Sequence, residues 1–428
     1  MSKRFQLTPE QIALSEERKA KKQKLQSQPS PSGNGDGIDG CILTRPWISL
    51  KHAENLDGVR LKLLTWNMLA QCLVRRELFP TSNCLKGVQR QPMLHTEILR
   101  QNADILCLQE VDSLDKLLPA LTAAGYTNHY AAGPGKKHGC LVAFKKPYSK
   151  IEDRLIHYDE QHVRTEGNEN ARRGSSFRTR NIGSLVALKN IDAEGEGVII
   201  GTTHLFWHPK QAGILIREIA QFRFDLHMEN WPCLIAGDFN FSPDDAGYSL
   251  LVGDQLNSEQ QNRLRMSRVV HVSVDPAIPP TTTAALADDE NDAVDPDRVI
   301  TNARPAVPTD GLLSDSELAT LFSSANIVRS AYDEGIRQHR EKSPDLPTFG
   351  TRVSLPSSAK GSNEPEYTSY THYWKADYIF ILSKRPAVVG GLLAPHTAKD
   401  LVPGLPQKGV SGSDHISLCA EILLPKSN

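Results

Sequence analysis

The chain has 428 residues, of which 39% are hydrophobic, and its formal net charge is −1 at pH 7. This length suits one large α/β domain with tails or two ordinary domains. The near-zero charge excludes a uniformly basic protein, so any nucleic-acid partner must be held by a local basic patch.

Residues 1–40 are predicted to form a disordered, basic N-terminal tail. A basic run at 18–24 is followed by a Ser-, Pro- and Gly-rich linker at 26–37. The run is typical of a nuclear localisation signal or an RNA-contacting arm, although a solvated helix face is the simpler explanation. We therefore expect a protein of the cytoplasm, the nucleus or both.

Membrane insertion and disulfide bonding are not expected. No apolar run approaches the ~20 residues of a membrane span, and the polar N-terminus does not resemble a secretory signal. The seven cysteines are scattered, and none forms a C-x-x-C pair. This pattern indicates reduced thiols in a reducing compartment, and it disfavours a zinc site.

From residue 41 onward, strand-like runs alternate with helix-like runs. Short apolar runs predict strands at 59–66, 105–109, 140–144, 182–188, 198–203, 233–236, 378–382 and 416–424. Runs with helical apolar spacing predict helices at 89–101, 113–124, 214–229 and 318–330. This mixture predicts an α/β fold of two packed β-sheets flanked by helices.

One segment interrupts the predicted domain at about residues 271–315. It is dense in Pro, Thr, Ala and Asp, and residues 288–292 are acidic or amide side chains. This composition predicts a disordered, acidic surface loop. No internal repeat is visible, and in particular no leucine-rich repeat.

Polar side chains that bind metals follow four of the predicted strands. The run at 233–236 leads into Asp238 and Asn240, and since positions i and i+2 of a strand share a face, both should project together. Three other runs end at Asn67, Glu110 and His204. A glutamate beside an apolar run is expensive to bury unless it is paired or bound to a metal.

Two further segments add an aspartate and a histidine. Asp377 begins the run at 378–382, and Asp414 and His415 precede the last strand. Neighbouring residues of an extended chain point to opposite faces, so a turn is needed to direct His415 inward. Either Asp377 or Asp414 can then orient its ring, and His415 can act as a general base.

Each of these residues also has a purely structural explanation. Asn67 and Asp238 suit turns, Glu110 suits a helix cap, and His204 suits a satisfied core histidine. Every one of these strand ends nevertheless carries Asn, Asp, Glu or His, which favours one common site at an edge of the sandwich. Its oxygen ligands, above all Glu110 and Asn67, indicate a hard cation such as Mg²⁺ or Mn²⁺.

These segments resemble the endonuclease/exonuclease/phosphatase superfamily, and within it the deadenylase-type branch that includes the yeast Ngl proteins, nocturnin and Angel. The motifs T-W-N-M-L, L-Q-E-V-D, T-H-L-F-W-H-P, G-D-F-N-F-S-P, A-D-Y-I-F and S-D-H follow one another between residues 60 and 424. The resemblance implies a four-layer α/β sandwich spanning residues 41–428. It also implies Mg²⁺-dependent hydrolysis of single-stranded RNA from the 3′ end, which releases 5′-nucleotides.

The resemblance assigns a role to each matched position. Glu110 would bind the metal, aided by Asn67. Asp238 and Asn240 would handle the nucleophile and the scissile phosphate, and His204 would contact phosphate.

The resemblance assigns roles to three more positions. His415 would be the general base or a transition-state stabiliser, with Asp377 as its partner, and Asn181 would line the pocket. The deadenylases stack a phenylalanine on adenine a few residues before the D-Y-I-F aspartate, whereas this chain has Tyr373 and Trp374 there. Either ring can stack on any base, so no strong adenine preference is expected.

Several functions stay open at this level. The basic stretch before the domain resembles the Ngl exonuclease linked to ribosomal RNA 3′-end maturation. The alternatives are a poly(A)-specific deadenylase acting on mRNA, a phosphodiesterase of the superfamily with a non-RNA substrate, a binding protein with an inactive site and a scaffold. Since leucine-rich repeats are missing, we expect no docking to a deadenylase complex. We also expect a monomer.

Overall fold

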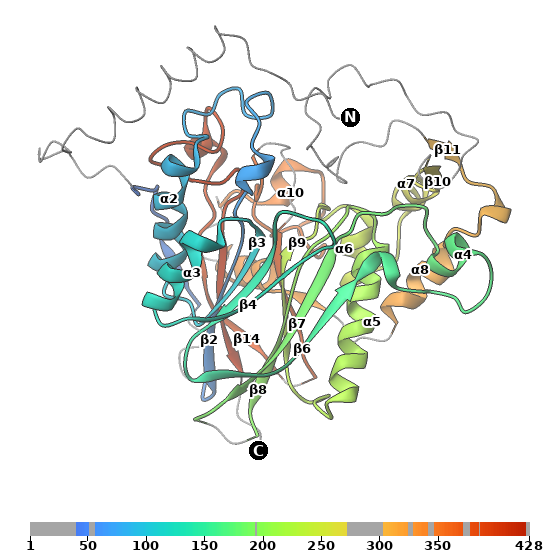
Figure 1. Ribbon diagram of the computed structural model, residues 1–428, viewed down its shortest axis with the longest axis horizontal. Coiled ribbons are helices and arrows are strands. Elements are labelled where there is room, and N and C mark those ends of the chain that lie inside the picture. The colour runs from blue at the N-terminus through green and yellow to red at the C-terminus, as the bar shows by residue number, and fades with distance from the viewer. Residues whose placement is uncertain are drawn as a thin grey trace, which may run out of the picture. The chain divides into compact units, whose positions relative to one another are not determined.

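Two β-sheets form the centre of the protein (Figure 1). The computed structural model describes residues 40–50, 56–192, 195–271, 303–323, 328–340, 346–370, 377–384 and 386–424. The strands of the two sheets are β1 (Trp47–Ser49), β2 (Val59–Asn67), β3 (Ile105–Val111), β4 (Thr127–Ala132), β5 (Gly139–Phe144), β6 (Tyr148–His157), β7 (Ile182–Asn190), β8 (Gly197–His204), β9 (Cys233–Asp238), β12 (Arg329–Ser330), β13 (Asp377–Leu382), β14 (Val388–Leu393) and β15 (Leu418–Leu424). Among the described residues, one sheet has the order β1-β14-β15-β2-β3-β5-β4 and the other β12-β13-β9-β8-β7-β6.

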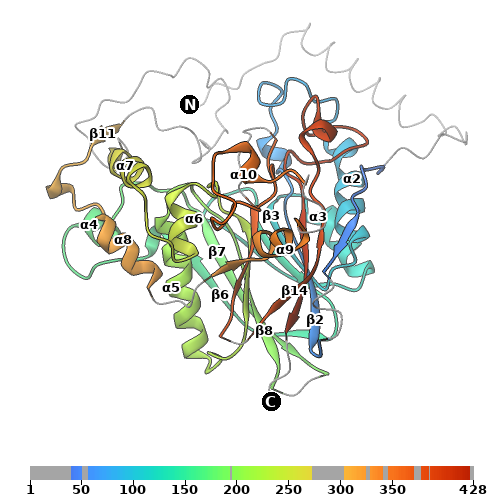
Figure 2. The ribbon, with the colours of Figure 1, turned by 180° about the vertical axis from the view of Figure 1, so that it is seen from behind.

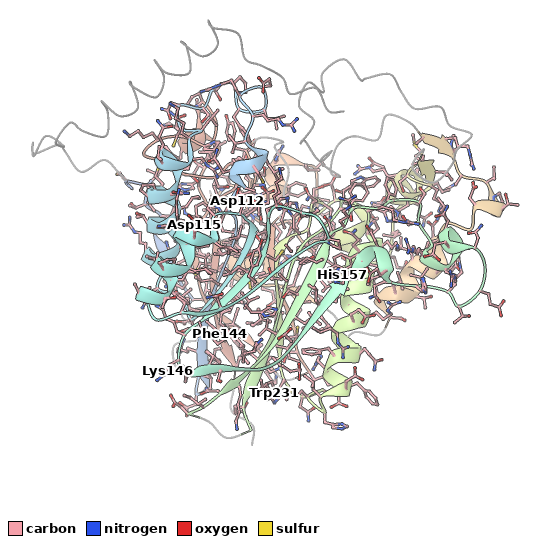
Figure 3. The ribbon with its side chains drawn as sticks, in the orientation of Figure 1. Asp112, Asp115, Phe144, Lys146, His157 and Trp231 are labelled. Carbon is pink, nitrogen blue, oxygen red and sulfur yellow. The ribbon has the colours of Figure 1, made fainter. Side chains whose placement is uncertain are left out.

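Each sheet contains one parallel pair of strands among antiparallel neighbours. β2 runs parallel to β3, and β8 runs parallel to β9. The carboxyl ends of such a pair meet at one edge of the sheet, as they do in other sheets with parallel strands. Figure 3 shows Asp112, which follows β3, near one end of the sheets, whereas Lys146 and Trp231 lie near the other end. β9 begins after Trp231 and therefore ends on the side of Asp112.

The two sheets pack face to face because their inner strands are apolar on both faces. In β3, Ile105 and Cys107 contribute to the core between the sheets, and Leu106 and Leu108 contribute to the core beneath the helices. All four side chains are fully buried. This alternation follows from the period of two in a strand, and it explains why β3 reads as a continuous apolar run.

Helices cover the outer face of each sheet (Figures 1 and 2). α2 (Gly87–Arg100) and α3 (Leu114–Ala123) pack on the seven-stranded sheet through a shared apolar cluster. α5 (Lys210–Asp225), α6 (Ala246–Leu251), α7 (Ser258–Met266) and α8 (Asp315–Phe322) contribute to the cluster on the six-stranded sheet. The predicted fold of two packed sheets flanked by helices is thus confirmed.

The remaining described elements are short or lie at the margins. They are α4 (Glu169–Arg173), β10 (Val269–His271), β11 (Ala303–Pro305), α9 (Ala331–Arg340), α10 (Phe349–Arg352) and the 3-10 turns η2 (Gln71–Leu73), η3 (Tyr158–Glu160), η4 (Pro308–Asp310) and η5 (Ala398–Leu401). Within the described ranges, no helix is long and apolar enough to span a bilayer.

Several predicted boundaries are wrong. α5 begins at Lys210 rather than at 214, because Pro209 at its N-cap has a φ of −65° and is already set for a helix. The helix predicted for 318–330 ends at Phe322, and Arg329–Ser330 instead pairs with β13, which satisfies its backbone at the edge of the sheet.

The acidic insertion is shorter at its C-terminal side than the prediction of 271–315. β11 pairs with β10, and Leu313 is buried in the apolar cluster beneath α5. Residues 303–315 therefore belong to the fold, because a buried leucine and a paired strand hold them to it. The rest of the predicted insertion, 272–302, and the predicted tail up to residue 39 lie outside the described residues.

Candidate active site

The side-chain amide of Asn67 joins the ends of the two sheets. Its Nδ2 atom donates to Glu110 Oε1 and to Asp238 Oδ2, both at 2.9 Å. Its Oδ1 atom accepts from the backbone N–H of Leu69 at 3.0 Å, which fixes the orientation of the amide. The nitrogen thus faces the two carboxylates, and Asn67 positions them. Its predicted role as a metal ligand stays a prediction.

Glu110 sits at an irregularity where β3 leaves its pairing with β5. Its Oε2 atom accepts from the backbone N–H of Ala70 at 2.9 Å. Burial by itself would raise the pKa of Glu110, but the charges of His204 and His138 and the bonds from Asn67 and Ala70 lower it to about 2. Glu110 is therefore a buried carboxylate that stays anionic at neutral pH.

His204 lies between two carboxylates at the end of β8. Its Nδ1 atom is 3.7 Å from Glu110 Oε1, and its Nε2 atom is 3.6 Å from Asp238 Oδ2. Both distances exceed a normal hydrogen bond. The ring is thus near enough to interact with either charge and is held tightly by neither, which leaves it able to donate to an anionic ligand.

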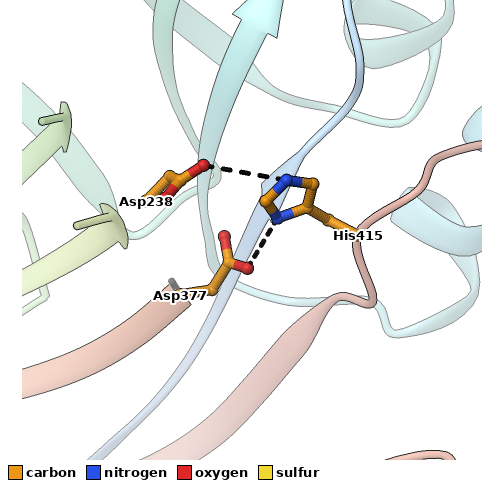
Figure 4. A group of neighbouring side chains, drawn as sticks. All are labelled: Asp238, Asp377 and His415. Carbon is orange, nitrogen blue, oxygen red and sulfur yellow. Dashed lines mark hydrogen bonds and ion pairs between the residues drawn. The ribbon is translucent and has the colours of Figure 1, made fainter. Parts of the chain in front are cut away.

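Asp377 and His415 form a buried pair (Figure 4). His415 Nδ1 lies 2.8 Å from Asp377 Oδ2, and its Nε2 atom lies 3.8 Å from Asp238 Oδ2. Asp377 faces Asp238 directly in the register of β13 and β9. Burial by itself would lower the pKa of His415, but the carboxylates of Asp377, Asp414 and Asp238 raise it well above its ordinary value.

The turn that was needed to direct His415 inward is present. Ser413 accepts the backbone N–H of His415 at 3.1 Å and donates its hydroxyl to the carbonyl of Asn67 at 2.7 Å. Of the two candidate carboxylates, Asp377 is therefore the one that orients the ring through Nδ1. Asp414 is buried nearby, where its charge acts on both His415 and Arg90.

Asn240 does not share a face with Asp238 as a continued strand would require. β9 ends at Asp238, and Asn240 adopts a left-handed backbone with a φ of 54°. Its backbone N–H donates to Asp238 Oδ1 at 3.0 Å, and its side chain donates to the carbonyl of Leu205 at 2.9 Å. The chain turns here because the aspartate side chain captures the amide two residues on.

Asn181 lines a pocket beside Glu110 and His204, as the resemblance implied. The pocket has a volume of about 270 Å³, and its other polar lining residues are Lys136, His138 and Arg180. Lys136 donates to the side-chain oxygen of Asn181 at 2.5 Å. Tyr373 and Trp374 lie outside the described residues, so their predicted stacking role stays a prediction.

Arg90 is an important residue that the sequence reading missed. It is 1% exposed and donates to the carbonyls of Met68, Leu69 and Gly412. It thereby ties the loop after β2 to the segment that carries His415. The available signal was its place on the apolar stripe of α2, with Met93 and Leu94 at positions i+3 and i+4.

Backbone strain also marks this region. Of the six described non-glycine residues with positive φ, four border the site, and left-handed backbone is costly for such residues. They are Leu69 (φ 56°), Glu110 (φ 54°), Arg180 (φ 57°) and Asn240 (φ 54°). Strain of this kind persists where the surrounding structure holds it, and it clusters at functional sites.

The donor set fits a divalent cation. Asp238, Asp377 and His415 each offer an atom within 4.8 Å of the others, and the carboxylate of Glu110 lies on the other side of His204. The Oδ1 atom of Asp377 is buried without a hydrogen-bond partner among the described residues. Several buried carboxylates this close together are costly unless a cation compensates their charge.

The chain belongs to the Endonuclease/Exonuclease/phosphatase family, whose model matches residues 64–415. It is accordingly a hydrolase of that family, and the polar strand ends from Asn67 to His415 all lie within the matched region.

Individual proteins are also similar to this chain. A probable RNA exonuclease of Schizosaccharomyces pombe is 28% identical over 97% of this chain and 88% of its own length. RNA exonuclease NGL2 of Saccharomyces cerevisiae is 30% identical over 56% of this chain and 52% of its own. Among solved structures, that of ANGEL2, which is named a 2′,3′-cyclic phosphatase, aligns with 90% of this chain and 100% of its own length, with a TM-score of 0.55 at 22% identity. That last likeness concerns the fold.

Proposed function

We propose that this protein is a Mg²⁺-dependent 3′–5′ exoribonuclease that releases 5′-nucleotides. The observation that carries the proposal is the Asp377–His415 pair, in which the second ring nitrogen of His415, Nε2, faces Asp238 at the strand ends of both sheets. A histidine oriented through one nitrogen can use the other to take a proton from water. The two relatives named as RNA exonucleases support RNA as the substrate.

The chain's residues divide the work according to their contacts. Glu110 would hold Mg²⁺, with Asp238 on the other side of the Asn67 amide, and Mn²⁺ is a chemical substitute. A bound Mg²⁺ would neutralise charge that develops on the phosphate. Asn67 holds Glu110 and Asp238 in place, and His204, between the same two carboxylates, donates to a phosphate oxygen.

His415 accepts a proton from the attacking water, and Asp377 stabilises the charged ring that results. Water adds to phosphorus, and the bond between phosphorus and the 3′ oxygen of the preceding nucleotide breaks. That oxygen takes a proton from water to become the new 3′ hydroxyl, and His415 returns its proton to the solvent. The products are a 5′-nucleotide and an RNA that is one nucleotide shorter. Asp238 and Asn240 orient the water and the scissile phosphate.

Two alternatives belong to the same chemistry. A poly(A)-specific deadenylase would require an adenine pocket, and a phosphodiesterase with a non-RNA substrate would require a site that rejects RNA. A role in ribosomal RNA 3′-end processing, in the nucleus, the cytoplasm or both, is the cellular extension of the proposal. The deadenylase, the non-RNA phosphodiesterase and the proposed exoribonuclease differ in the substrate that each should prefer.

The test is product analysis with 5′-labelled single-stranded RNA and Mg²⁺. We expect a ladder that shortens from the 3′ end, 5′-nucleotides by chromatography and similar rates on all four homopolymers. Asp238→Asn should stop the reaction, while Asp225→Asn, an exposed carboxylate on α5, should leave the rate unchanged. A strong preference for poly(A) would favour the deadenylase, and phosphate release from a cyclic end without shortening would overturn the proposal.

A further inference from the structure

A row of cations leads away from the pocket along the segment before β7. Arg180 lines the pocket itself, Arg178 is half-buried two residues earlier, and Lys210 begins α5. Within the part of the chain that the structure describes, Arg178 and Lys210 form no ion pair with a carboxylate. The guanidinium of Arg178 donates to the carbonyls of Ser175 and Phe177 and to the side chain of Asn170, and these neutral acceptors leave its charge uncompensated. Their neighbours differ in this respect, since Arg164 is paired with Glu317 and Arg173 with Glu169.

Lys210 is the least expected member of this row. It is 7% exposed, and its ammonium group has no hydrogen-bond partner among the described side chains and carbonyls. The charges of Asp159, Arg178 and Arg173 act on it, and burial, with the repulsion of the arginines, lowers its pKa to about 8. Asp159 itself accepts the backbone N–H of Arg180 at 2.7 Å. A buried cation among other cations is stabilised when an anion joins it.

The N-terminus of α5 adds to this field. Its N-cap is Pro209, which makes no side-chain capping bond. The backbone N–H of Lys210 donates to Nδ1 of His208 at 3.2 Å. The next amides of the first helical turn have no partner within a helix, and the helix dipole places partial positive charge there. Together with the unpaired ammonium group of Lys210, this end of a 16-residue helix is arranged for an anion.

A cluster of three aromatic rings, Phe177, Phe206 and Trp207, lies just before the N-terminus of α5. Phe177 packs on Phe206 with ring centroids 4.9 Å apart, and Phe206 packs on Trp207 at 5.4 Å. Trp207 is 43% exposed, which is unusual for a ring of this size. Cations that follow a backbone and rings on which bases stack are together the pattern of single-stranded nucleic-acid binding.

We propose that Lys210, Arg178 and the N-terminus of α5 bind a backbone phosphate of the RNA upstream of the scissile bond, with Trp207 stacked on a neighbouring base. This inference rests on the proposed function, since it supplies the path of the same strand. Arg180 and Lys136 connect the two sites, because both line the pocket that contains Glu110. The row explains how a chain with a net charge of −1 can hold RNA.

The test compares Lys210→Met and Arg178→Gln with Lys189→Met, an exposed lysine at the opposite end of β7. Binding of a labelled single-stranded RNA is measured in a Glu110→Gln background, so that the result does not depend on turnover. We expect Kd to rise about tenfold for each subsite variant and the salt slope to fall by about 1. Lys189→Met should change neither quantity.

Two further arms make the outcome decisive. Lys210→Arg should restore binding, because it keeps the charge, and Trp207→Ala should weaken RNA binding without changing competition by inorganic phosphate. If all variants bind RNA like the parent, the subsite is refuted even when the enzyme degrades RNA. If inorganic phosphate protects the parent from thermal unfolding through Lys210 but RNA does not bind there, the site belongs to a free anion and the proposal is wrong. Failure to hydrolyse RNA with intact Lys210-dependent binding would overturn the proposed function alone.

Discussion

Asn67 and Asp238 come from different sheets, yet the amide of Asn67 donates to Asp238 at 2.9 Å. The same amide nitrogen donates to Glu110. One side chain therefore sets the distance between the carboxylate at the end of β3 and the carboxylate at the end of β9. The two sheets and the candidate site are coupled through this bond.

Removal of that coupling should lower activity without unfolding the protein. We predict that Asn67→Ala reduces kcat/KM by ~10–100-fold, as the loss of a residue that orients metal ligands typically does. Circular dichroism checks the fold, and Asn262→Ala, an exposed amide on α7, serves as the control. Full activity of Asn67→Ala would show that the carboxylates do not need this amide.

The Asp377–His415 pair should contribute through proton transfer. We predict that His415→Ala lowers kcat by ~10²–10⁴, the usual range for the loss of a general acid or base. The comparison is His339→Ala on α9, which should be neutral. Steady-state kinetics on one RNA checks both, and an unchanged kcat for His415→Ala would remove this residue from the reaction.

The pair also predicts a pH dependence. The pKa of His415 is raised mainly by Asp377, and a general base must be unprotonated, so the rate should rise with pH through that pKa. Asp377→Asn should move this rising limb to lower pH and reduce the maximal rate. A pH–rate profile of both proteins tests the sign, and a limb that moves to higher pH in the variant would contradict the assignment.

The raised pKa of His415 makes the stability of the fold fall as pH rises, whereas the rate of the reaction should increase. A histidine whose folded pKa is raised stabilises the fold fully below its unfolded pKa of about 6.5, and the contribution is lost as pH rises through the folded pKa. Asp377→Asn should therefore destabilise the protein more in mildly acidic than in alkaline solution. Urea unfolding at two pH values measures this difference, and equal losses at both would argue against the charged pair.

Arg90 should stabilise the fold through its hydrogen bonds to buried carbonyls. Arg90→Met leaves the buried carbonyls of Met68 and Gly412 without their donor, which costs about 1–3 kcal/mol for each unsatisfied group. We predict a loss of about 3 kcal/mol in the free energy of unfolding, measured with urea. Arg100→Met, an exposed arginine of the same helix, should lie within about 0.5 kcal/mol of the parent.

The sequence predicts best where one local pattern decides the structure. β3 is apolar at every position up to Gln109, so its existence and the polar residue at its end could both be read from the chain. β6 could not, because it is an edge strand with exposed residues such as Ile151 and Glu152 and shows no clear apolar alternation. The backbone conformation just after a strand was also unpredictable, as the left-handed turn at Asn240 shows.

The sequence predicted which polar residues gather at the strand ends, but it did not predict their contacts. The local sequence pattern does not separate Asp377 from Asp414 as the partner of His415, and only the family resemblance implied Asp377. The choice depends on the pairing of β13 with β9. Arg90 and Lys210 were missed for a related reason. A cation in a helix usually faces solvent, and only the folded structure shows that these two are buried.

The most direct test of the account is the Mg²⁺ dependence of RNA hydrolysis by the parent and by Glu110→Gln. Glutamine keeps the size of the side chain and its hydrogen bond from Ala70, but it removes the charge. The account predicts that chelation of Mg²⁺ abolishes the activity of the parent, that Mg²⁺ restores it, and that Glu110→Gln stays inactive at every Mg²⁺ concentration while its melting temperature is retained. Hydrolysis by Glu110→Gln at the parent's rate and with the parent's Mg²⁺ dependence would contradict it.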